Sequence, residues 1–331
     1  MTTMRAVIVR EFGGLDQLTL AEVDPPQPMP DEVVIDVVAA GLNRADIMQR
    51  RGFYPPPQGA SDILGLEVSG RVSAVGSEVR RWRVGDEVCA LLEGGGYAEQ
   101  VAVAFGQVMP VPRGVALADA AALPEVAATV WSNVVMTAGL HAGQVLLVHG
   151  GSSGIGTMAT QVARELGATV AVTAGSAEKL TACADLGASI LVNYREDDFV
   201  AELHAATDGR GADVILDNMG AKYLARNIAA LADGGRLVVI GLQGGRRAEL
   251  DLGALLGKRA GVIATSLRTR ARAEKARVVA ATVAHVWPMV ESGAVRPIIA
   301  ARFPLAEVAA AQALMEESSH IGKILLDVTS A

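Results

Sequence analysis

Cysteine is scarce in this sequence: the 331 residues include two, Cys89 and Cys183, which stand far apart in the chain. Two isolated cysteines exclude a disulfide framework, and they also exclude a structural zinc lobe built on four cysteine ligands. Both cysteines stand in apolar surroundings, which predicts that they are buried as small hydrophobic side chains.

Long apolar runs are absent as well. Hydrophobic residues make up 51% of the chain, but no stretch approaches the roughly 20 residues needed to cross a bilayer. Residues 1–10 lack the apolar core and the cleavage site of a signal peptide, and residues 4–9 have the pattern of a strand. We therefore expect a cytosolic protein with no membrane partner.

A strong charge of one sign is also missing. The net charge is −7, with acidic and basic residues interspersed, whereas a nucleic-acid-binding surface requires a basic patch. No nucleic-acid partner is expected. The one basic cluster, residues 268–277, is interpreted either as a solvated loop and helix start or as a rim that attracts cofactor phosphates.

The pattern of the chain changes near residue 124. Before this point, short apolar segments are separated by proline and glycine, which predicts a small β-barrel or sandwich. From about 125 to 265, strands alternate with helices, which predicts βαβ units around a parallel sheet. The fold class is therefore α/β, and the tail is expected to pack back on the first module.

The predicted elements are as follows. In the first module, strands are expected at 4–9, 32–40, 66–75, 86–91 and 97–103. In the second, strands are expected at 145–149, 169–174, 190–193, 213–217, 236–241 and 262–266, with helices at 154–166, 177–186, 196–207 and 221–232. The tail is expected to form helices 273–291 and 305–317 and the strand 323–328.

The most informative motif is a glycine-rich turn between strand 145–149 and the helix after it. Free N–H groups and the dipole at a helix N-terminus create an anion site. Gly151 and Gly156 fit the ends of the dinucleotide fingerprint G-x-G-x-x-G, with Ser153 in place of the middle glycine. Four residues of this turn are expected to hold phosphate: Ser152, Ser153, Gly154 and Ile155.

The same residues of the glycine-rich turn also allow other interpretations. Residues 150–154 match the G-x-S-x-G nucleophile elbow of α/β-hydrolases, but His204, His285 and His320 stand in no recognisable triad context. A short-chain dehydrogenase would need a Tyr-x-x-x-Lys pair, and none of the four tyrosines has lysine four residues later. A purely structural turn stays open beside the favoured nucleotide loop.

The end of the next strand indicates the cofactor. An NAD site places Asp or Glu there, against the ribose hydroxyls, and no acid closes this strand. Gly175 opens space, Ser176 offers a hydroxyl and Lys179 a positive charge, while Tyr194 after the third strand adds a donor. These residues favour NADPH through its 2′-phosphate. The alternative, which is compatible with the first, is a helix cap at Ser176 and a solvated Lys179.

Several motifs together resemble the medium-chain dehydrogenase/reductase superfamily, in its zinc-free quinone oxidoreductase (zeta-crystallin-like) branch. They are residues 40–46 (AGLNRAD), 64–70 (LGLEVSG), 84–88 (VGDEV), 94–99 (GGGYAE) and 321–324 (IGKI), together with the glycine-rich turn. The resemblance covers nearly the whole chain. It implies a GroES-like β-rich domain at 1–123 and 267–331, and a Rossmann NADPH-binding domain with a doubly wound parallel sheet at 124–266. It also implies a homodimer formed through the last Rossmann strand, near residues 260–266.

The resemblance to a zinc-free branch is carried by two positions. Zinc-dependent relatives have Cys where this chain has Asn43, and His where it has Leu66. Asn and Leu leave too few ligands for a catalytic zinc, so no metal is expected. Without a Lewis acid, alcohol oxidation is disfavoured. Reduction of an electrophile such as a quinone mainly needs donor and acceptor to be aligned.

The same resemblance implies site residues. Asn43 and Tyr54 are expected to line the acceptor site, where they would hydrogen-bond a substrate oxygen or the nicotinamide ribose; the alternatives are a turn residue and an exposed loop aromatic. The remaining cofactor contacts implied by the resemblance are Thr129, Gly241, Leu242, Ser266, Leu267, Arg268 and Lys323. For Lys323 the alternative is a solvated charge on an edge strand.

His149 ends the strand before the turn. It is interpreted either as a general acid or as a packed residue with one ring nitrogen bonded to the backbone.

Three functions follow from the sequence. The first is an NADPH-dependent quinone oxidoreductase. The second is a zinc-free reductase of enones or enoyl thioesters on the same scaffold. The third is a protein that binds NADPH without turnover.

Overall fold

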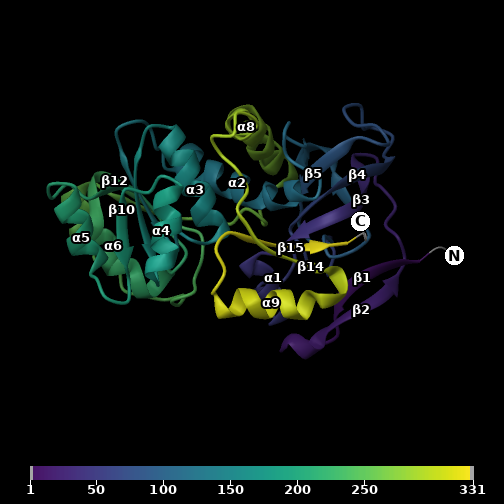
Figure 1. Ribbon diagram of the computed structural model, residues 1–331, viewed down its shortest axis with the longest axis horizontal. Helices are drawn as coiled ribbons and strands as arrows, with labels where there is room; N and C mark the ends of the chain where they lie inside the picture. Colours follow the sequence, from purple (N-terminus) through teal and green to yellow (C-terminus); the bar gives the residue numbers. More distant parts are fainter. Residues whose placement is uncertain (1–2, 329–331) are drawn as a thin grey trace. The chain divides into compact units, whose positions relative to one another are not determined.

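The chain divides into two compact units in the computed structural model, which describes residues 3–328 (Figure 1). The first unit comprises Met1–Ala128, Leu267–Glu291 and Pro297–Ala331, and the second comprises Thr129–Ser266 and Ser292–Arg296. Residues 1–2 and 329–331 of the predicted first domain lie outside the described residues. The first unit extends to Ala128, and within it the Glu125 amide at the start of a helix donates to Glu67 (2.9 Å).

The first unit is built on a seven-stranded sheet with the order β14-β15-β3-β4-β5-β7, in which β6 also pairs with β3. A separate hairpin consists of β1 and β2. The strands are β1 (Met4–Val9), β2 (Leu18–Val23), β3 (Glu32–Gly41), β4 (Glu67–Val75), β5 (Glu87–Leu91), β6 (Gln100–Ala104), β7 (Val108–Pro110), β14 (Ile299–Pro304) and β15 (Lys323–Asp327). The helices are α1 (Arg44–Arg50), α8 (Arg272–Glu291) and α9 (Val308–Glu317), and the short α2 (Pro124–Val130) crosses the boundary between the units.

The C-terminal tail completes the sheet of the first unit. β15 pairs antiparallel with β3, and β14 pairs parallel with β15; Figure 1 shows these yellow strands beside the purple β3. The apolar faces of β3, β15 and α9 meet in one buried cluster that includes Ile35, Ala311 and Ile324. A lone helix and strand cannot bury their own apolar faces. The pairing of the tail with β3 buries these faces, as the sequence predicted.

The second unit holds a six-stranded sheet with the order β10-β9-β8-β11-β12-β13, in which every neighbouring pair is parallel. This is the doubly wound order of dinucleotide-binding domains, so the predicted α/β fold class is confirmed. The strands are β8 (Val145–His149), β9 (Thr169–Ala174), β10 (Ile190–Asn193), β11 (Ala212–Asp217), β12 (Leu231–Val239) and β13 (Gly261–Ala264). The helices are α3 (Gly154–Glu165), α4 (Ala177–Asp185), α5 (Phe199–Ala206), α6 (Leu224–Ala230) and α7 (Leu252–Lys258). Figure 1 shows α3 and α4 on one side of this sheet and α5 and α6 on the other.

Some predicted bounds were wrong. The expected helix 221–232 begins as a 3₁₀ turn over Gly220–Tyr223, and α6 ends at Ala230, after which β12 starts directly at Leu231. Short Ala- and Leu-rich runs carry no periodicity that separates a strand from a helix. The sequence also did not predict β2, β7, β14, α1, α2 and α7, each of which is short or has an apolar pattern that is incomplete.

The strand order places a switch point beside the glycine-rich turn. β8 pairs with β9 on one side and with β11 on the other. The strands β8 to β10 therefore extend the sheet in one direction, and the strands β11 to β13 extend it in the other. Ligands of open α/β sheets bind beyond the carboxyl ends of the strands at such a point. The fold therefore directs attention to the loops after β8, β9, β11 and β12.

Candidate functional site

The turn after β8 packs too closely to tolerate side chains at two of its glycines. A Cβ on Gly156 would overlap the carbonyl oxygens of Gly150 and Gly151. A Cβ on Gly151 would lie 2.6 Å from the Cβ atom of Val172 in β9. Gly150 itself has φ +73°, a left-handed conformation that glycine adopts without strain. These glycines bring the start of α3 against the sheet, as a dinucleotide-binding turn requires.

The serine that replaces the middle glycine is the N-cap of α3. The Ser153 Oγ atom accepts a hydrogen bond from Gly156 N (3.0 Å), and the Ser153 carbonyl accepts from Thr157 N (2.8 Å). The N–H groups of Gly154 and Ile155 are the first two of the helix and have no intrahelical acceptor. The geometry thus leaves two backbone donors and a helix dipole at one point, which fits a pyrophosphate. Ser152, the fourth predicted residue of the turn, is buried.

The end of β9 gathers the residues predicted for a 2′-phosphate. Ser176 is the N-cap of α4, with its Oγ atom 3.4 Å from Lys179 N. A Cβ on Gly175 would lie 2.5 Å from the Tyr194 hydroxyl and 3.3 Å from Arg195 Nε. The phenol and guanidinium groups therefore approach the backbone where β9 ends.

Arg195 is a site residue that the sequence analysis missed. Burial and then the charge of Arg195 lower the pKa of Lys179, so the two cations lie near each other. Two cations beside a glycine and a serine hydroxyl form a group of donors that suits a phosphate dianion. The signal was present as Arg195 directly after Tyr194, but an exposed arginine after a strand resembles an ordinary surface charge.

The remaining predicted residues of the second unit follow the carboxyl ends of the same sheet. Gly241 stands two residues after β12, and a Cβ there would lie 2.8 Å from the carbonyl oxygen of Asn218, which follows β11. Leu242 is half exposed. Ser266 stands two residues after β13, whereas Thr129 is buried in α2, with its carbonyl accepting from Asn133 Nδ2 (2.8 Å).

Asn218 is a second residue that the sequence analysis missed. A Cβ on Gly150 would lie 2.9 Å from Asn218 Nδ2, so this side chain stands at the switch point beside the turn. The Asn218 Oδ1 atom is buried and has no hydrogen-bond partner within the described residues. An acceptor in this position is suited to a donor group of a bound ligand.

In the first unit, Asn43 belongs to a buried polar network. Its Nδ2 donates to Glu67 Oε1 (2.9 Å), and its Oδ1 accepts from Lys323 Nζ (2.9 Å). Lys323 also forms an ion pair with Glu67 Oε1 (2.5 Å) and donates to the Leu42 carbonyl (2.5 Å). Lys323 and Glu67 are both buried. The alternative of a solvated edge charge for Lys323 is wrong, and all three of its ammonium protons have acceptors inside this unit.

Asp46 joins the same region from α1. Its carboxylate accepts from Tyr97 OH (2.8 Å), Asn43 N (2.8 Å) and Gly65 N (3.1 Å). Burial raises the pKa of Asp46 to about 6, and these hydrogen bonds together with the charge of Lys323 oppose the rise. The network fixes the start of α1, which Asn43 directly precedes.

Tyr54 is held by Arg268. The guanidinium carbon of Arg268 lies 5.2 Å from the centre of the Tyr54 ring, and Nη1 donates to the Tyr54 carbonyl (3.3 Å). Arg268 is buried and also donates to the Glu93 carbonyl (2.7 Å) and to Gln49 Oε1 (2.7 Å). Arg268 and its buried neighbour Leu267 belong to the first unit. The structure thus gives Arg268 a clear role in positioning Tyr54.

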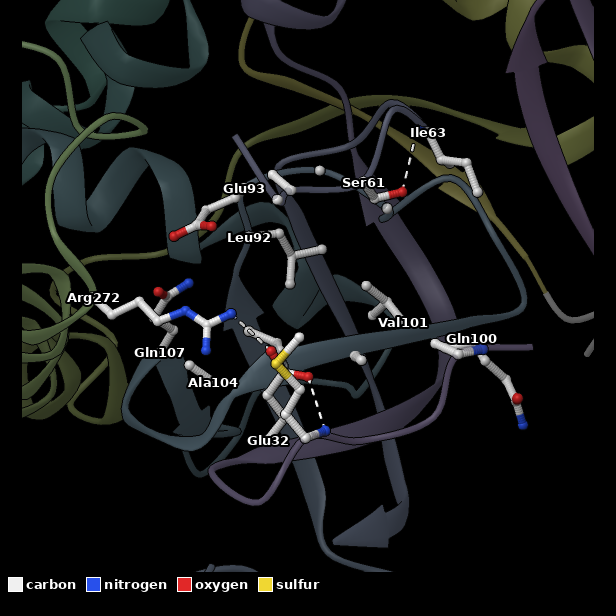
Figure 2. A pocket seen from close by; sticks show the side chains of 18 of the residues that line it. Glu32, Ser61, Ile63, Leu92, Glu93, Gln100, Val101, Ala104, Gln107 and Arg272 are labelled. Carbon is white, nitrogen blue, oxygen red and sulfur yellow. Dashed lines mark hydrogen bonds and ion pairs between the residues drawn. The ribbon is translucent and has the colours of Figure 1, made fainter. Parts of the chain in front are cut away.

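A cavity of about 350 Å³ lies elsewhere in the first unit (Figure 2). Arg272 and Glu32 form an ion pair in its wall (2.8 Å), and Glu32 Oε2 accepts from Met29 N (3.1 Å). Glu93 in the same wall pairs with Lys275. Arg272 of the basic cluster 268–277 lines this cavity, but none of the individually predicted site residues does.

Residues 3–328 contain neither a metal cluster nor a membrane span. Within this range, no group of three or more His, Cys, Asp or Glu side chains is arranged to hold a metal ion. No helix of the same range combines the length and the apolar character that a membrane span requires.

His149 is buried, and its partners are side chains rather than the backbone. Nε2 lies 2.7 Å from Asn227 Oδ1 and Nδ1 lies 3.1 Å from Thr173 Oγ1. Burial lowers the pKa of His149 to about 4, with a smaller lowering by the Arg226 charge. A buried ring with both nitrogens engaged by neighbouring side chains favours the packed interpretation.

The lowered pKa of His149 predicts a pH-dependent stability. Below the unfolded pKa of about 6.5, the unfolded chain binds a proton that the folded chain rejects down to about pH 4, so stability falls as the pH falls through this window. The loss should amount to about 3 kcal/mol between pH 7 and pH 4. In His149→Gln this component is absent. Urea unfolding of both proteins should therefore give a free-energy difference that shrinks with acidification, whereas a constant difference would contradict the assignment.

The fold and these sites define a nucleotide-binding dehydrogenase or reductase: a Rossmann sheet with a phosphate turn at its switch point, accompanied by a β-rich unit. Comparison with known proteins agrees. Residues 29–113 match the family of alcohol dehydrogenase GroES-like domains, and residues 154–283 match the family described as zinc-binding dehydrogenase.

Individual relatives indicate the branch of the family to which this chain belongs. The quinone oxidoreductase of Rattus norvegicus is 31% identical over 326 residues, which cover 98% of this chain and 97% of the relative. The mycocerosic acid synthase-like polyketide synthase of Mycobacterium tuberculosis is 32% identical over an alignment of 332 positions, which covers 98% of this chain and only 15% of the synthase. The chain therefore spans only a small part of the polyketide synthases that it matches. It belongs to the medium-chain dehydrogenase/reductase superfamily, in its quinone oxidoreductase branch.

Solved structures agree with this membership. The Escherichia coli quinone oxidoreductase complexed with NADPH superposes with a TM-score of 0.88 at 27% identity, covering 98% of this chain and 100% of that one. The CurK enoyl reductase superposes with a TM-score of 0.87 at 26% identity, covering 99% and 100%. Both neighbours thus share the fold of this chain over nearly its whole length and support its membership of the superfamily.

Proposed function

We propose that this protein is an NADPH-dependent oxidoreductase that reduces a quinone without a catalytic zinc. The observation that carries the cofactor assignment is the group of Tyr194, Arg195, Lys179 and Ser176 around Gly175. Two cations and two hydroxyls suit a 2′-phosphate, and no carboxylate closes β9 to repel it or to bind the free ribose hydroxyls of NADH.

The residues at the two positions where zinc-dependent relatives have ligands support the zinc-free part of the proposal. Asn43 and Leu66 are not zinc ligands. The Glu67 carboxylate beside Asn43 already has a cation, because the Lys323 ammonium group forms an ion pair with it. A further cation at this point would compete with Lys323, so this network fits a reductase without a metal better than a zinc enzyme.

In this proposal the cofactor and the residues of the protein have separate roles. NADPH, when bound, supplies the hydride. The turn at Gly150–Ser153 and the first amides of α3 bind the pyrophosphate, and Lys179 with Arg195 fixes the adenosine end. We propose that Asn43 and Tyr54 orient the acceptor, with Arg268 holding the Tyr54 loop. Cofactor contacts through Thr129, Gly241, Leu242, Ser266 and Leu267 remain part of the proposal.

The quinone is the favoured acceptor because relatives that match over nearly their whole length carry that name, such as the rat protein at 97% coverage. A second candidate is reduction of an enone or enoyl thioester, which is supported by the similarity to the CurK enoyl reductase. Both acceptors are activated electrophiles, so the same alignment of donor and acceptor serves either.

Stopped-flow oxidation of NADPH separates these functions. With the purified protein, a panel of 1,4-quinones is expected to give turnover, and 2-alkenals little or none. Turnover with alkenals alone would replace the proposal by the second candidate. Tight NADPH binding with no turnover on any acceptor would identify a binding protein without activity, and absence of NADPH binding would overturn the cofactor assignment.

We also propose a homodimer formed through β13, the edge strand of the parallel sheet. The helix α7, which precedes β13 in the chain and packs against β12, exposes Leu252 and Leu256, with 64% and 78% of their surfaces accessible. An unpaired strand edge next to exposed leucines is typical of a surface that a second copy covers. Sedimentation velocity is expected to give a dimer for the wild type and a monomer for Leu252→Glu/Leu256→Glu; a wild-type monomer would contradict the proposal.

A further inference from the structure

His149 stands between the phosphate turn and the core of the second unit. It is the last residue of β8 and directly precedes Gly150. Its ring packs edge-on against Phe199 and Tyr223, with ring centres 4.8 and 4.9 Å away. The ring therefore has one fixed orientation, which directs Nε2 to Asn227 and Nδ1 to Thr173.

The hydrogen atoms of this chain of contacts can be assigned. Burial raises the pKa of the Asp217 carboxyl, and the nearby Asn227 amide opposes this rise, although Asn227 Nδ2 has no hydrogen-bond partner within the described residues. A carboxylate only accepts. The amide nitrogen therefore faces Asp217 and Oδ1 faces His149. An amide oxygen accepts, so Nε2 of His149 carries the proton and Nδ1 is an acceptor. The Thr173 hydroxyl then donates to Nδ1 (3.1 Å), which leaves its oxygen free to accept.

Thr173 in turn holds both amides at the start of the turn. Its hydroxyl oxygen accepts from Gly150 N over a long contact (3.4 Å), and its carbonyl accepts from Gly151 N (3.0 Å). One threonine of β9 thus fixes the two residues that set the direction of the chain into α3. The orientation of its hydroxyl depends on the acceptor that His149 provides.

We propose that His149 is a positioning residue for dinucleotide binding: acting through Thr173, it holds the Gly150–Gly151 backbone so that the first amides of α3 face the pyrophosphate. This inference rests on the proposed function, because it assumes that the turn binds a dinucleotide. His149 touches neither cofactor nor substrate in this role.

The electrostatics of the site keep His149 in the required form. A protonated ring would present a donor to Thr173 and turn the hydroxyl hydrogen away from Nδ1, which would change the geometry in which the oxygen accepts from Gly150 N. Burial and the Arg226 charge lower the pKa of the ring and keep it neutral. The other ionisable groups around the chain of contacts are Asp217, which reaches it through Asn227, and the Tyr223 phenol, which packs on the ring.

The experiment measures dissociation constants of NADPH and NADH for Thr173→Val, His149→Leu and His149→Asn by fluorescence titration. Thr173→Val keeps the shape of the side chain and removes only the hydroxyl. We expect about a tenfold weaker affinity for both cofactors in Thr173→Val and His149→Leu, the size of one hydrogen bond. The ratio of the two constants should not change, because both cofactors share the pyrophosphate.

His149→Asn is the conservative rescue. Its side-chain oxygen can accept from the Thr173 hydroxyl where Nδ1 did, so it should recover most of the affinity that His149→Leu loses. The matched control is Thr160→Val in α3, which removes a buried hydroxyl that has no hydrogen-bond partner within the described residues. The control should leave both dissociation constants unchanged.

The outcomes separate the inference from the function on which it rests. The inference is overturned if Thr173→Val and His149→Leu melt at a lower temperature but bind both cofactors as tightly as the wild type does. His149 would then only stabilise the fold. A changed ratio of NADPH to NADH affinity would also overturn it. A wild type that binds neither cofactor would instead refute the proposed function. Should His149→Leu not fold, Thr173→Val and His149→Asn still decide the matter.

Discussion

Lys179→Ala/Arg195→Ala should lower kcat/KM for NADPH by about 100-fold and leave that for NADH within about twofold. Each cation is expected to form a charge-assisted hydrogen bond with the 2′-phosphate, and each such bond contributes about 1.5–3 kcal/mol. Arg195 is exposed and Lys179 is half-buried, so water screens these bonds and the lower part of that range applies. NADH has no 2′-phosphate and loses nothing.

The comparison needs a control with the same change of charge. Arg236→Ala/Arg259→Ala removes two cations from the opposite edge of the same sheet, where β12 and β13 begin their pairing. This variant should keep the preference for NADPH. Steady-state kinetics with both cofactors at two salt concentrations measures the effect. Salt screens the attraction between the two cations and the 2′-phosphate, so the higher salt concentration should weaken the preference of the wild type for NADPH. Equal losses for NADPH and NADH in the Lys179/Arg195 variant would show that the 2′-phosphate binds elsewhere.

The parallel sheet and its phosphate turn could be predicted from the sequence because their signals are local. Buried parallel strands are short apolar runs, and the turn at residues 150–156 needs its glycines for reasons that lie within the turn itself. The cap at Ser153 and the cap at Ser176 are likewise decided within a few residues. Such features depend little on what the rest of the chain does.

The surroundings of Lys323 could not be predicted in this way. Its partners, Leu42, Asn43 and Glu67, are more than 250 residues away in the sequence, and they meet it only because β15 pairs with β3. A lysine at the start of a terminal strand has no local feature that distinguishes a buried ion pair from a solvated charge. Its contact with the cofactor, implied by resemblance, stays a prediction beside the internal contacts that it makes here.

Asn218 and Arg195 were missed for a related reason. Each follows a strand, at the edge where ligands bind, but polar residues are common after any strand. Only the strand order, which places β11 beside β8 and β10 beside β9, brings these two residues to Gly150 and Gly175. Once a doubly wound sheet is inferred, the residues that follow its strands should be considered as a group.

Lys323→Met should destabilise the first unit by about 3–5 kcal/mol, because it leaves the buried Glu67 carboxylate without its cation. Methionine has nearly the length of lysine, so little packing is lost and the effect is electrostatic. A loss of this size should lower the melting temperature by roughly 10 °C. Calorimetry, or urea unfolding at neutral pH, provides the measurement.

The double variant Glu67→Gln/Lys323→Met tests the cause. Glu67 Oε2 accepts from Glu125 N (2.9 Å) and Oε1 accepts from Asn43 Nδ2 (2.9 Å). A glutamine can keep the first bond with its oxygen, and it can donate from its nitrogen to Asn43 if the Asn43 amide turns over, which the loss of Lys323 permits. The double variant should therefore recover most of the stability that Lys323→Met loses. If the double variant is as unstable as the single one, the ammonium group stabilises the unit by holding Leu42 and Asn43 rather than by neutralising Glu67, and the charge argument against a metal at this position fails with it.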